Sequence, residues 1–137
     1  MNLLNRRLLP TACVLLGIAL AVRGDTTSPD GKLEAVADGD AVRLLDKASG
    51  KEVRTLKGHV GAVTALAFAP DGKILASGGN DKTVRAWDLA AGKLIWQFDG
   101  KAAVAALSYS KDGKTLTVTD ENKNEQQLDA AAGKVLP

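Results

Sequence analysis

Several residue types on which functional sites commonly depend are scarce in this chain. Its 137 residues include one cysteine and one histidine, and only 4% of them are aromatic. A single cysteine excludes an internal disulfide framework and a thiolate-rich zinc site, and a single histidine excludes a multi-histidine metal site. The sequence therefore predicts no metal site and no bound cofactor.

An excess of charge of one sign is also missing. The chain has 18 Lys and Arg against 16 Asp and Glu, which gives a net charge of +2. Proteins that bind nucleic acid or anionic lipid present a more basic surface, so nucleic acid is not an expected partner. The remaining composition, 45% hydrophobic and 25% charged, favours one small globular domain and excludes a disordered or fibrous chain.

The first 24 residues differ from the rest of the chain. Arg6 and Arg7 precede an uncharged stretch over 8–22, and no acidic residue occurs before Asp25. This layout is typical of a secretory signal peptide. The stretch has 15 residues, fewer than the roughly 17 to 25 of a membrane-spanning helix. The sequence therefore predicts a cleaved signal peptide at 1–24, no membrane span after cleavage, and export to a bacterial periplasm or out of the cell.

Two details of this segment stay open. Small residues allow cleavage after Ala21 or after Gly24. Cys13 raises the alternative of a lipid-anchored lipoprotein, but Pro10 opens the tetrapeptide that ends at this cysteine, and most of the apolar run follows it. This context argues against the lipoprotein alternative.

A repeat of 41 residues organises the rest of the sequence. One marker, Asp-Gly-Lys, recurs at 30–32, 71–73 and 112–114. A second marker, Gly-Lys preceded by small residues, keeps nearly the same step at 50–51, 92–93 and 133–134. A fixed period of this length indicates a repeat architecture.

Short segments rich in Val, Leu, Ile and Thr lie between these markers and are bounded by turn signals. In the middle copy they predict strands over 63–69, 74–78, 84–89 and 94–98. No stretch after residue 25 keeps a helical apolar period long enough to replace them. The sequence thus predicts an all-β fold of consecutive antiparallel meanders, with units at about 25–57, 58–99 and 100–137.

The middle copy reads GHVGAVTALAFAPDGKILASGGNDKTVRAWDL from Gly58 to Leu89, with Gly-His near its start and Trp-Asp near its end. It resembles a near-consensus blade of the WD-repeat β-propeller family, and a weaker resemblance extends over 25–137. The resemblance implies a partial propeller of about three four-stranded blades. The first blade is expected to lack its inner strand, because the polar segment 22–28 stands where the middle copy has 63–69.

The same resemblance implies a structural polar network within the middle blade. It carries over to His59, Ser77, Asp81 and Trp87. A Ser-His-Asp hydrolase is the competing interpretation of these residue types, but the chain contains no Gly-x-Ser-x-Gly nucleophile motif. We therefore expect no catalytic residues. The flanking copies lack the pattern, with Val36, Asp40 and Leu45 in the first and Lys101, Val118, Asn122 and Leu128 in the third.

The function implied by the resemblance is that of a non-catalytic protein-interaction scaffold. The residues expected to contact a partner are polar groups of the middle blade, Asp71, Lys73, Asn80, Lys82 and Arg85. Two alternatives remain: a fragment or subunit of a periplasmic propeller enzyme, and an envelope structural protein that assembles with itself.

Three blades are fewer than the 4 to 8 of a typical propeller. An arc of three is expected to expose an apolar face at each end, and such faces promote association. A protein partner would cover them, or self-association of two arcs would complete a ring. A third possibility is that the chain is a remnant of a longer repeat protein.

Overall fold

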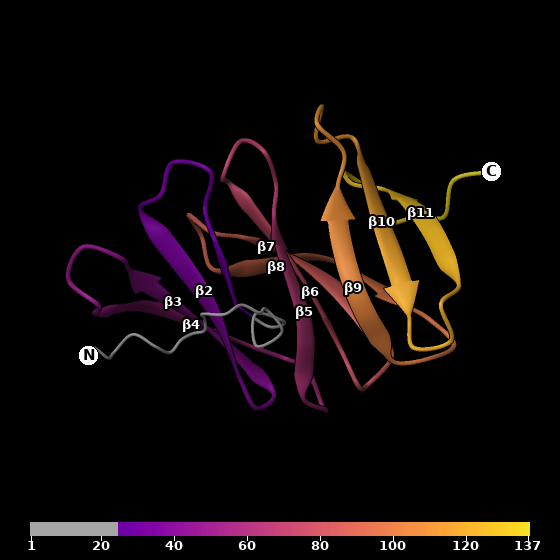
Figure 1. Cartoon of the computed structure of the whole chain (residues 1–137), viewed down its shortest axis with the longest axis horizontal. Coiled ribbons are helices and arrows are strands. Elements are labelled where there is room, and N and C mark those ends of the chain that lie inside the picture. The colour runs from indigo at the N-terminus through magenta and orange to yellow at the C-terminus, as the bar shows by residue number, and fades with distance from the viewer. Residues whose placement is uncertain (1–24) are drawn as a thin grey trace, which may run out of the picture.

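The computed structural model describes residues 25–137, which form eleven strands in three antiparallel sheets. Residues 1–24, on which the signal-peptide, cleavage-site and Cys13 predictions rest, lie outside the described residues. The sheets stand side by side like blades of a fan, in chain order from one end of the molecule to the other (Figure 1). Within the described part, there is no helix long and apolar enough to cross a membrane.

Each sheet is a meander of consecutive strands. The first contains β1 (Asp25–Thr27), β2 (Leu33–Asp38), β3 (Ala41–Asp46) and β4 (Glu52–Lys57). The second contains β5 (Val63–Phe68), β6 (Ile74–Gly79), β7 (Thr83–Asp88) and β8 (Lys93–Asp99). The third contains β9 (Val104–Tyr109), β10 (Thr115–Asp120) and β11 (Glu125–Asp129). The predicted all-β fold, a partial propeller of three blades, is confirmed.

The blade that falls short of four strands is the third, not the first. The prediction that the first blade lacks its inner strand is wrong, because Thr26 and Thr27 of β1 pair with Ala35 and Glu34 of β2. Pairing uses backbone groups, and threonine suits strands, so a polar segment can occupy this position. In the third blade the place of a fourth strand holds only an isolated bridge between Leu128 and Val135.

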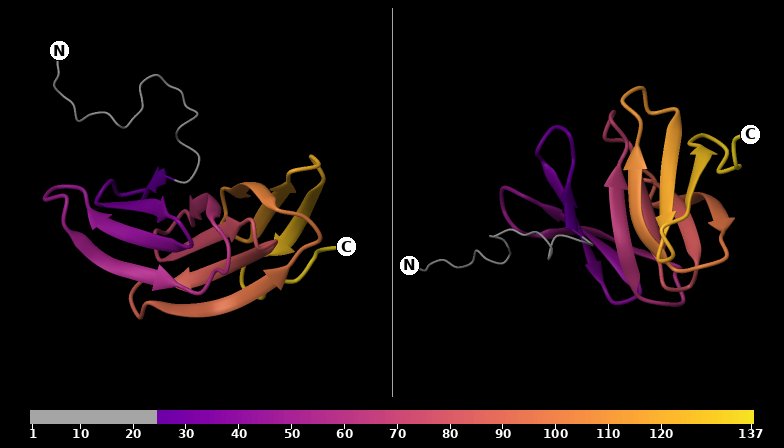
Figure 2. Two further views of the ribbon diagram at one scale, coloured as in Figure 1. Left: turned by 90° about the horizontal axis from the view of Figure 1, so that it is seen from below. Right: turned by 45° about the vertical axis from the view of Figure 1, so that its right-hand side comes forward.

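The hydrophobic core is divided between the two junctions where neighbouring blades meet. The first junction packs Leu44 and Leu56 of the first blade against Leu75 and Trp87 of the second. The second junction contains small side chains of the middle blade, such as Ala65 and Ala86, packed with Leu116, Val118 and Leu128 of the third. The middle blade is therefore covered on both faces (Figure 2).

A contact at the outer edge recurs at two of the three copies of the second sequence marker. Trp96 of β8 lies over the turn at Gly133 in the third blade, and its Nε1 donates to the Ala130 carbonyl at 2.8 Å. Arg54 of β4 lies in the same way over the turn at Gly92. Both glycines have positive φ, and a Cβ on either would come within 2.4 Å of the side chain above it. The repeated glycine thus provides both the turn and the space for its neighbour.

The two end faces of the arc are more polar than the sequence led us to expect. The register places Thr117, Thr119, Glu125 and Gln127 on the outer face of the third blade. On the outer face of the first blade, Arg43 bonds Glu52 at 2.8 Å and lies 3.8 Å from Asp38, among half-buried Val36 and Leu45. The expectation of an apolar face at each end is therefore wrong for the third blade and only partly right for the first.

Candidate functional site

The structure brings the four residues of the expected polar network into one continuous chain of hydrogen bonds. Trp87 Nε1 donates to Ser77 Oγ at 2.8 Å. Ser77 Oγ lies 2.7 Å from His59 Nε2, and His59 Nδ1 lies 3.0 Å from Asp81 Oδ2. The chain crosses the middle blade from β7 through β6 to the loop before β5, so it connects segments that are far apart in sequence.

One proton arrangement satisfies every member of this chain. Since the indole N–H can only donate, Ser77 Oγ accepts from Trp87 and donates its own proton to His59 Nε2. His59 then carries its proton on Nδ1 and donates it to Asp81. This tautomer is assigned from the bonding pattern. It leaves the imidazole neutral and the carboxylate ionised.

The carboxylate of Asp81 also organises the β6–β7 turn. It accepts hydrogen bonds from the amide of Val60 at 3.0 Å and from the hydroxyl of Thr83 at 2.9 Å. Burial by itself would raise the pKa of Asp81, but these bonds together hold that pKa below its ordinary value. Thr83 was not among the residues predicted for the network; its place two residues after an aspartate in a turn is the signal that could have identified it.

The environment of His59 keeps the imidazole uncharged and out of reach of solvent. Its side chain is 1% exposed and that of Asp81 is 3% exposed. Burial lowers the pKa of His59, and the opposing effect of the Asp81 carboxylate does not cancel this shift. The Ser77 hydroxyl is fully buried as well. The arrangement can therefore fix a loop to a turn, but no side chain in it is open to a substrate.

The five residues predicted to contact a partner do not form one patch. Asp71 and Lys73 are exposed in the β5–β6 turn, and Asn80 and Lys82 are exposed in the β6–β7 turn. Because β6 runs between these turns, they lie at opposite ends of the blade. Arg85 lies within β7 and is half-buried, with its guanidinium beside Gly58. Arg85 is therefore less accessible to a partner than the four turn residues.

The comparisons with known proteins agree with this geometry. Residues 50–88 match the family model described as WD domain, G-beta repeat. This chain carries a WD repeat. The matched residues comprise the outer strand β4 of the first blade and strands β5 to β7 of the second, so one WD repeat spans the junction between two sheets. WD-repeat proteins generally serve as protein-interaction scaffolds.

The relatives are longer proteins. A stretch of 77 residues is 42% identical to the target of rapamycin complex subunit wat1 of Schizosaccharomyces pombe, and covers 55% of this chain and 24% of that protein. An uncharacterized WD repeat-containing protein of Synechocystis is 45% identical over 69 residues, 50% of this chain and 20% of that protein. The serine-threonine kinase receptor-associated protein of Homo sapiens is 42% identical over 66 residues, 45% of this chain and 19% of that protein. The matched region thus spans at most 24% of the length of these relatives.

The outer blades have apolar side chains at positions that belong to the polar chain in the middle blade. The residues at the positions of Ser77 and Trp87 in the third blade are Val118 and Leu128, and both are part of the apolar core at the second junction. In the first blade they are Val36 and Leu45, which lie on the outer face.

No group of three or more His, Cys, Asp or Glu within 25–137 is arranged to hold a metal ion.

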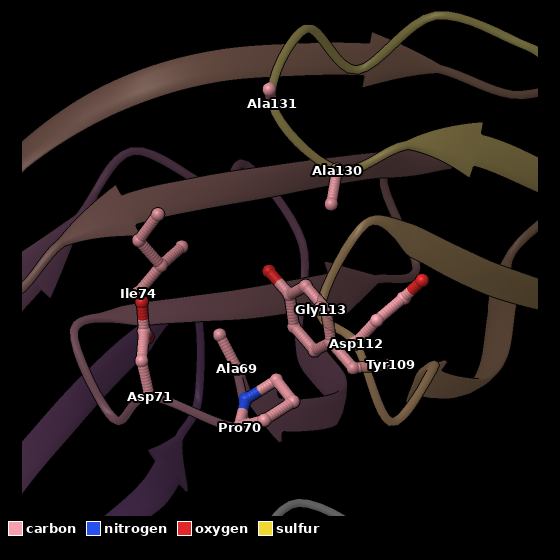
Figure 3. A pocket seen from close by; sticks show the side chains of 9 residues that line it. All are labelled: Ala69, Pro70, Asp71, Ile74, Tyr109, Asp112, Gly113, Ala130 and Ala131. Atoms are coloured by element: carbon pink, nitrogen blue, oxygen red, sulfur yellow. The ribbon is translucent and has the colours of Figure 1, made fainter.

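A pocket between the second and third blades was not predicted from the sequence (Figure 3). It lies at the end of the blades that carries the β5–β6 turn, opposite the His59 network. Its walls come from the β5–β6 turn, from Tyr109 at the end of β9, and from the turns after β9 and β11. The signal for it in the sequence is a difference between repeats: Tyr109 and Ala130 stand where the preceding copy has Phe68 and Leu89.

Proposed function

We propose that this chain is a non-catalytic interaction module that binds another protein through the β6–β7 turn of its WD repeat. This proposal rests on a difference in exposure between neighbouring residues of that turn. Asp81 is held by the buried network, while its neighbours Asn80 and Lys82 are exposed. A rigid frame that presents polar loop residues is a common basis of recognition, because little conformational freedom is lost on binding.

Two double substitutions, one in this turn and one in the first blade, test this proposal. Lys82 has a φ of 69°, so Lys82→Asn removes its charge with a residue that tolerates this conformation. Combined with Asn80→Ser, it is expected to reduce capture of the protein partner at least about tenfold. The matched control, Asp30→Asn with Lys32→Gln in the exposed turn before β2 of the first blade, is expected to leave capture unchanged. Equal capture by both double variants would exclude the β6–β7 turn as the binding surface.

The enzyme alternative makes a different prediction for the single histidine. In our proposal, His59→Ala leaves the Ser77 hydroxyl proton without its acceptor and removes one of the hydrogen bonds to the buried Asp81 carboxylate, which lowers the free energy of unfolding by about 1 to 3 kcal/mol. A hydrolase that used His59 would lose turnover and keep its stability. Thermal unfolding of the variant, measured beside esterase and peptidase assays of the unmodified chain, distinguishes the two classes.

We further propose that the module acts after export, in a bacterial periplasm or outside the cell. Support comes from Arg6 and Arg7 ahead of the apolar stretch 8–22. N-terminal sequencing of the protein purified from its producing cells tests this. Export with cleavage predicts a first residue of Val22 or Asp25, whereas a chain that begins at Met1 contradicts it.

A heterologous partner is favoured over closure of a ring by two copies. Ring closure would bury two polar outer faces, which carry Glu125 and Gln127 on the third blade and the Arg43–Glu52 pair on the first. Burying charged and polar groups without complementary partners is unfavourable. Self-assembly, as in an envelope structural protein, would instead give a mass that rises with concentration.

A further inference from the structure

We propose that the pocket between the second and third blades binds a lysine side chain of the partner protein. This inference rests on the proposed function, because it assumes a protein partner. It concerns the end of the blades opposite the β6–β7 turn, so the two proposals can fail separately.

The pocket arises where the two junctions of the chain differ. At the first junction, Phe68 and Leu89 pack against the core between the first and second blades. One repeat later, 41 residues along the sequence, their places are taken by Tyr109 and Ala130. The exchange of leucine for alanine removes side-chain volume, and the exchange of phenylalanine for tyrosine adds a hydroxyl beside the space.

The space left at the second junction has a volume of about 260 Å³. Pockets for drug-sized ligands measure roughly 300 to 1,000 Å³, so this one suits a single side chain. Ala69, Pro70, Ile74 and Ala130 supply apolar walls. Figure 3 shows the Tyr109 hydroxyl directed across the pocket, toward the side that holds Ile74 and Ala130.

The Tyr109 hydroxyl has no hydrogen-bond partner, although its oxygen is buried. A buried polar atom left without a partner costs about 1 to 3 kcal/mol, so a ligand that bonds to it recovers free energy. Burial is the main cause that raises the pKa of Tyr109 to about 12, and the negative charge of Asp71 is the second. Tyr109 and Asp71 both line the pocket.

The charges of the lining residues indicate which group fits. Asp71 and Asp112 are the charged residues among the lining, and both are acidic. Lys73, Lys111 and Lys114 belong to the same turns but are exposed and do not line the pocket. An ammonium bound there would have an unpartnered hydroxyl as an acceptor and two carboxylates of opposite charge in the lining.

Lysine fits this site better than arginine. Asp71 Oδ1 already accepts from the backbone amide of Lys73 at 2.9 Å, which leaves one carboxylate oxygen without that bond. A guanidinium binds most favourably to two parallel acceptors, whereas an ammonium binds as a point charge. The apolar walls then contact the four-carbon stem of the lysine.

A titration of the full chain with two model compounds tests the inference. The compounds are Nα-acetyl-lysine N-methylamide and Nα-acetyl-norleucine N-methylamide, which share the apolar stem and differ in the charge. NMR is expected to show the lysine compound binding about tenfold more tightly, as a charge-assisted hydrogen bond predicts. Equal binding of the two compounds, or binding of neither, would overturn the inference.

Three variants test whether the lysine compound binds in the pocket. Ala130→Leu restores the residue found at the first junction and is expected to abolish binding while the chain stays folded. Tyr109→Phe, which removes only the hydroxyl, is expected to weaken binding about fivefold to tenfold. The matched control is Asp30→Asn, one repeat before Asp71, and it is expected to leave binding unchanged. Binding that survives Ala130→Leu in the folded protein, or that is unaffected by Tyr109→Phe, contradicts the assignment.

Capture of the partner separates this inference from the proposed function. If Ala130→Leu leaves capture intact while Asn80→Ser with Lys82→Asn abolishes it, the pocket inference fails and the proposed surface stands. If the lysine compound binds in the pocket but Asn80→Ser with Lys82→Asn leaves capture of the partner unchanged, the β6–β7 turn is excluded as the binding surface and the pocket inference is supported.

Discussion

At the scale of single residues, the main feature is that one histidine is stabilised in its neutral form inside the middle blade. His59 gives its Nδ1 proton to Asp81 and accepts from Ser77. A charged imidazole would lose the bond from Ser77, because both ring nitrogens would then be donors. The network is therefore sensitive to protonation.

This sensitivity predicts a loss of stability in mild acid. The pKa of His59 is lowered on folding, so below about pH 6.5 the unfolded chain binds a proton that the folded chain does not. By linkage, the free energy of unfolding decreases as the pH falls from about 7 to about 5. Thermal unfolding across this range measures the effect, and His59→Gln removes the only histidine as a control. An unfolding temperature that is the same at both pH values contradicts the proposed tautomer.

The single tyrosine provides a second measurement at this scale. Because the chain contains one tyrosine, its near-ultraviolet tyrosinate absorbance reports Tyr109 alone. Burial raises the pKa of Tyr109 to about 12, so little tyrosinate is expected near pH 10, where an exposed tyrosine is half ionised. A titration midpoint near 10 in the folded protein would show that this hydroxyl is in contact with solvent. Asp71→Asn, which removes the second cause, is expected to lower the midpoint.

At the scale of elements, a side chain from one blade packs over a glycine turn of the next blade along the chain. The turn at Gly133 lies beneath Trp96 and the turn at Gly92 beneath Arg54. A Cβ at Gly50, in the equivalent turn of the first blade, would meet no neighbouring side chain within 4 Å. The three turns share a backbone conformation but differ in their surroundings.

These turns allow a matched pair of substitutions. Gly50→Ala introduces only the cost of positive φ for a residue with a Cβ, about 1 to 2 kcal/mol. Gly133→Ala introduces the same cost and also a collision with Trp96, which adds about 1 to 3 kcal/mol through overpacking. Chemical denaturation of both variants measures the difference. Equal destabilisation would mean that the Trp96 contact does not hold the third blade in place.

At the scale of the whole molecule, the arc ends in polar faces. The outer face of the third blade presents Thr117, Thr119, Glu125 and Gln127, and polar end surfaces limit association in repeat proteins. On the first blade, the charges around Arg43 limit the area of Val36 and Leu45 that a neighbour can cover.

We therefore expect the full chain to be monomeric in the absence of its partner. Sedimentation velocity at two protein concentrations checks this, with one sedimentation coefficient expected at both. Thr117→Leu with Thr119→Leu creates an apolar patch on the outer face of the third blade and is expected to promote association. A dimer of the unmodified chain would favour closure of a ring.

The sequence by itself determined the all-β fold and the number of blades, because turn signals and strand periodicity are local and recur every 41 residues. It also indicated the members of the His59 chain through the resemblance of the middle copy to a WD repeat. The tertiary structure decided what no local pattern gives. These are the pairing of β1 with β2, the place of the Arg85 guanidinium beside Gly58, and the pocket at Tyr109. The first two depend on how strands and loops of one blade come together, and the pocket depends on how two blades pack, so no pattern within a single repeat encodes them.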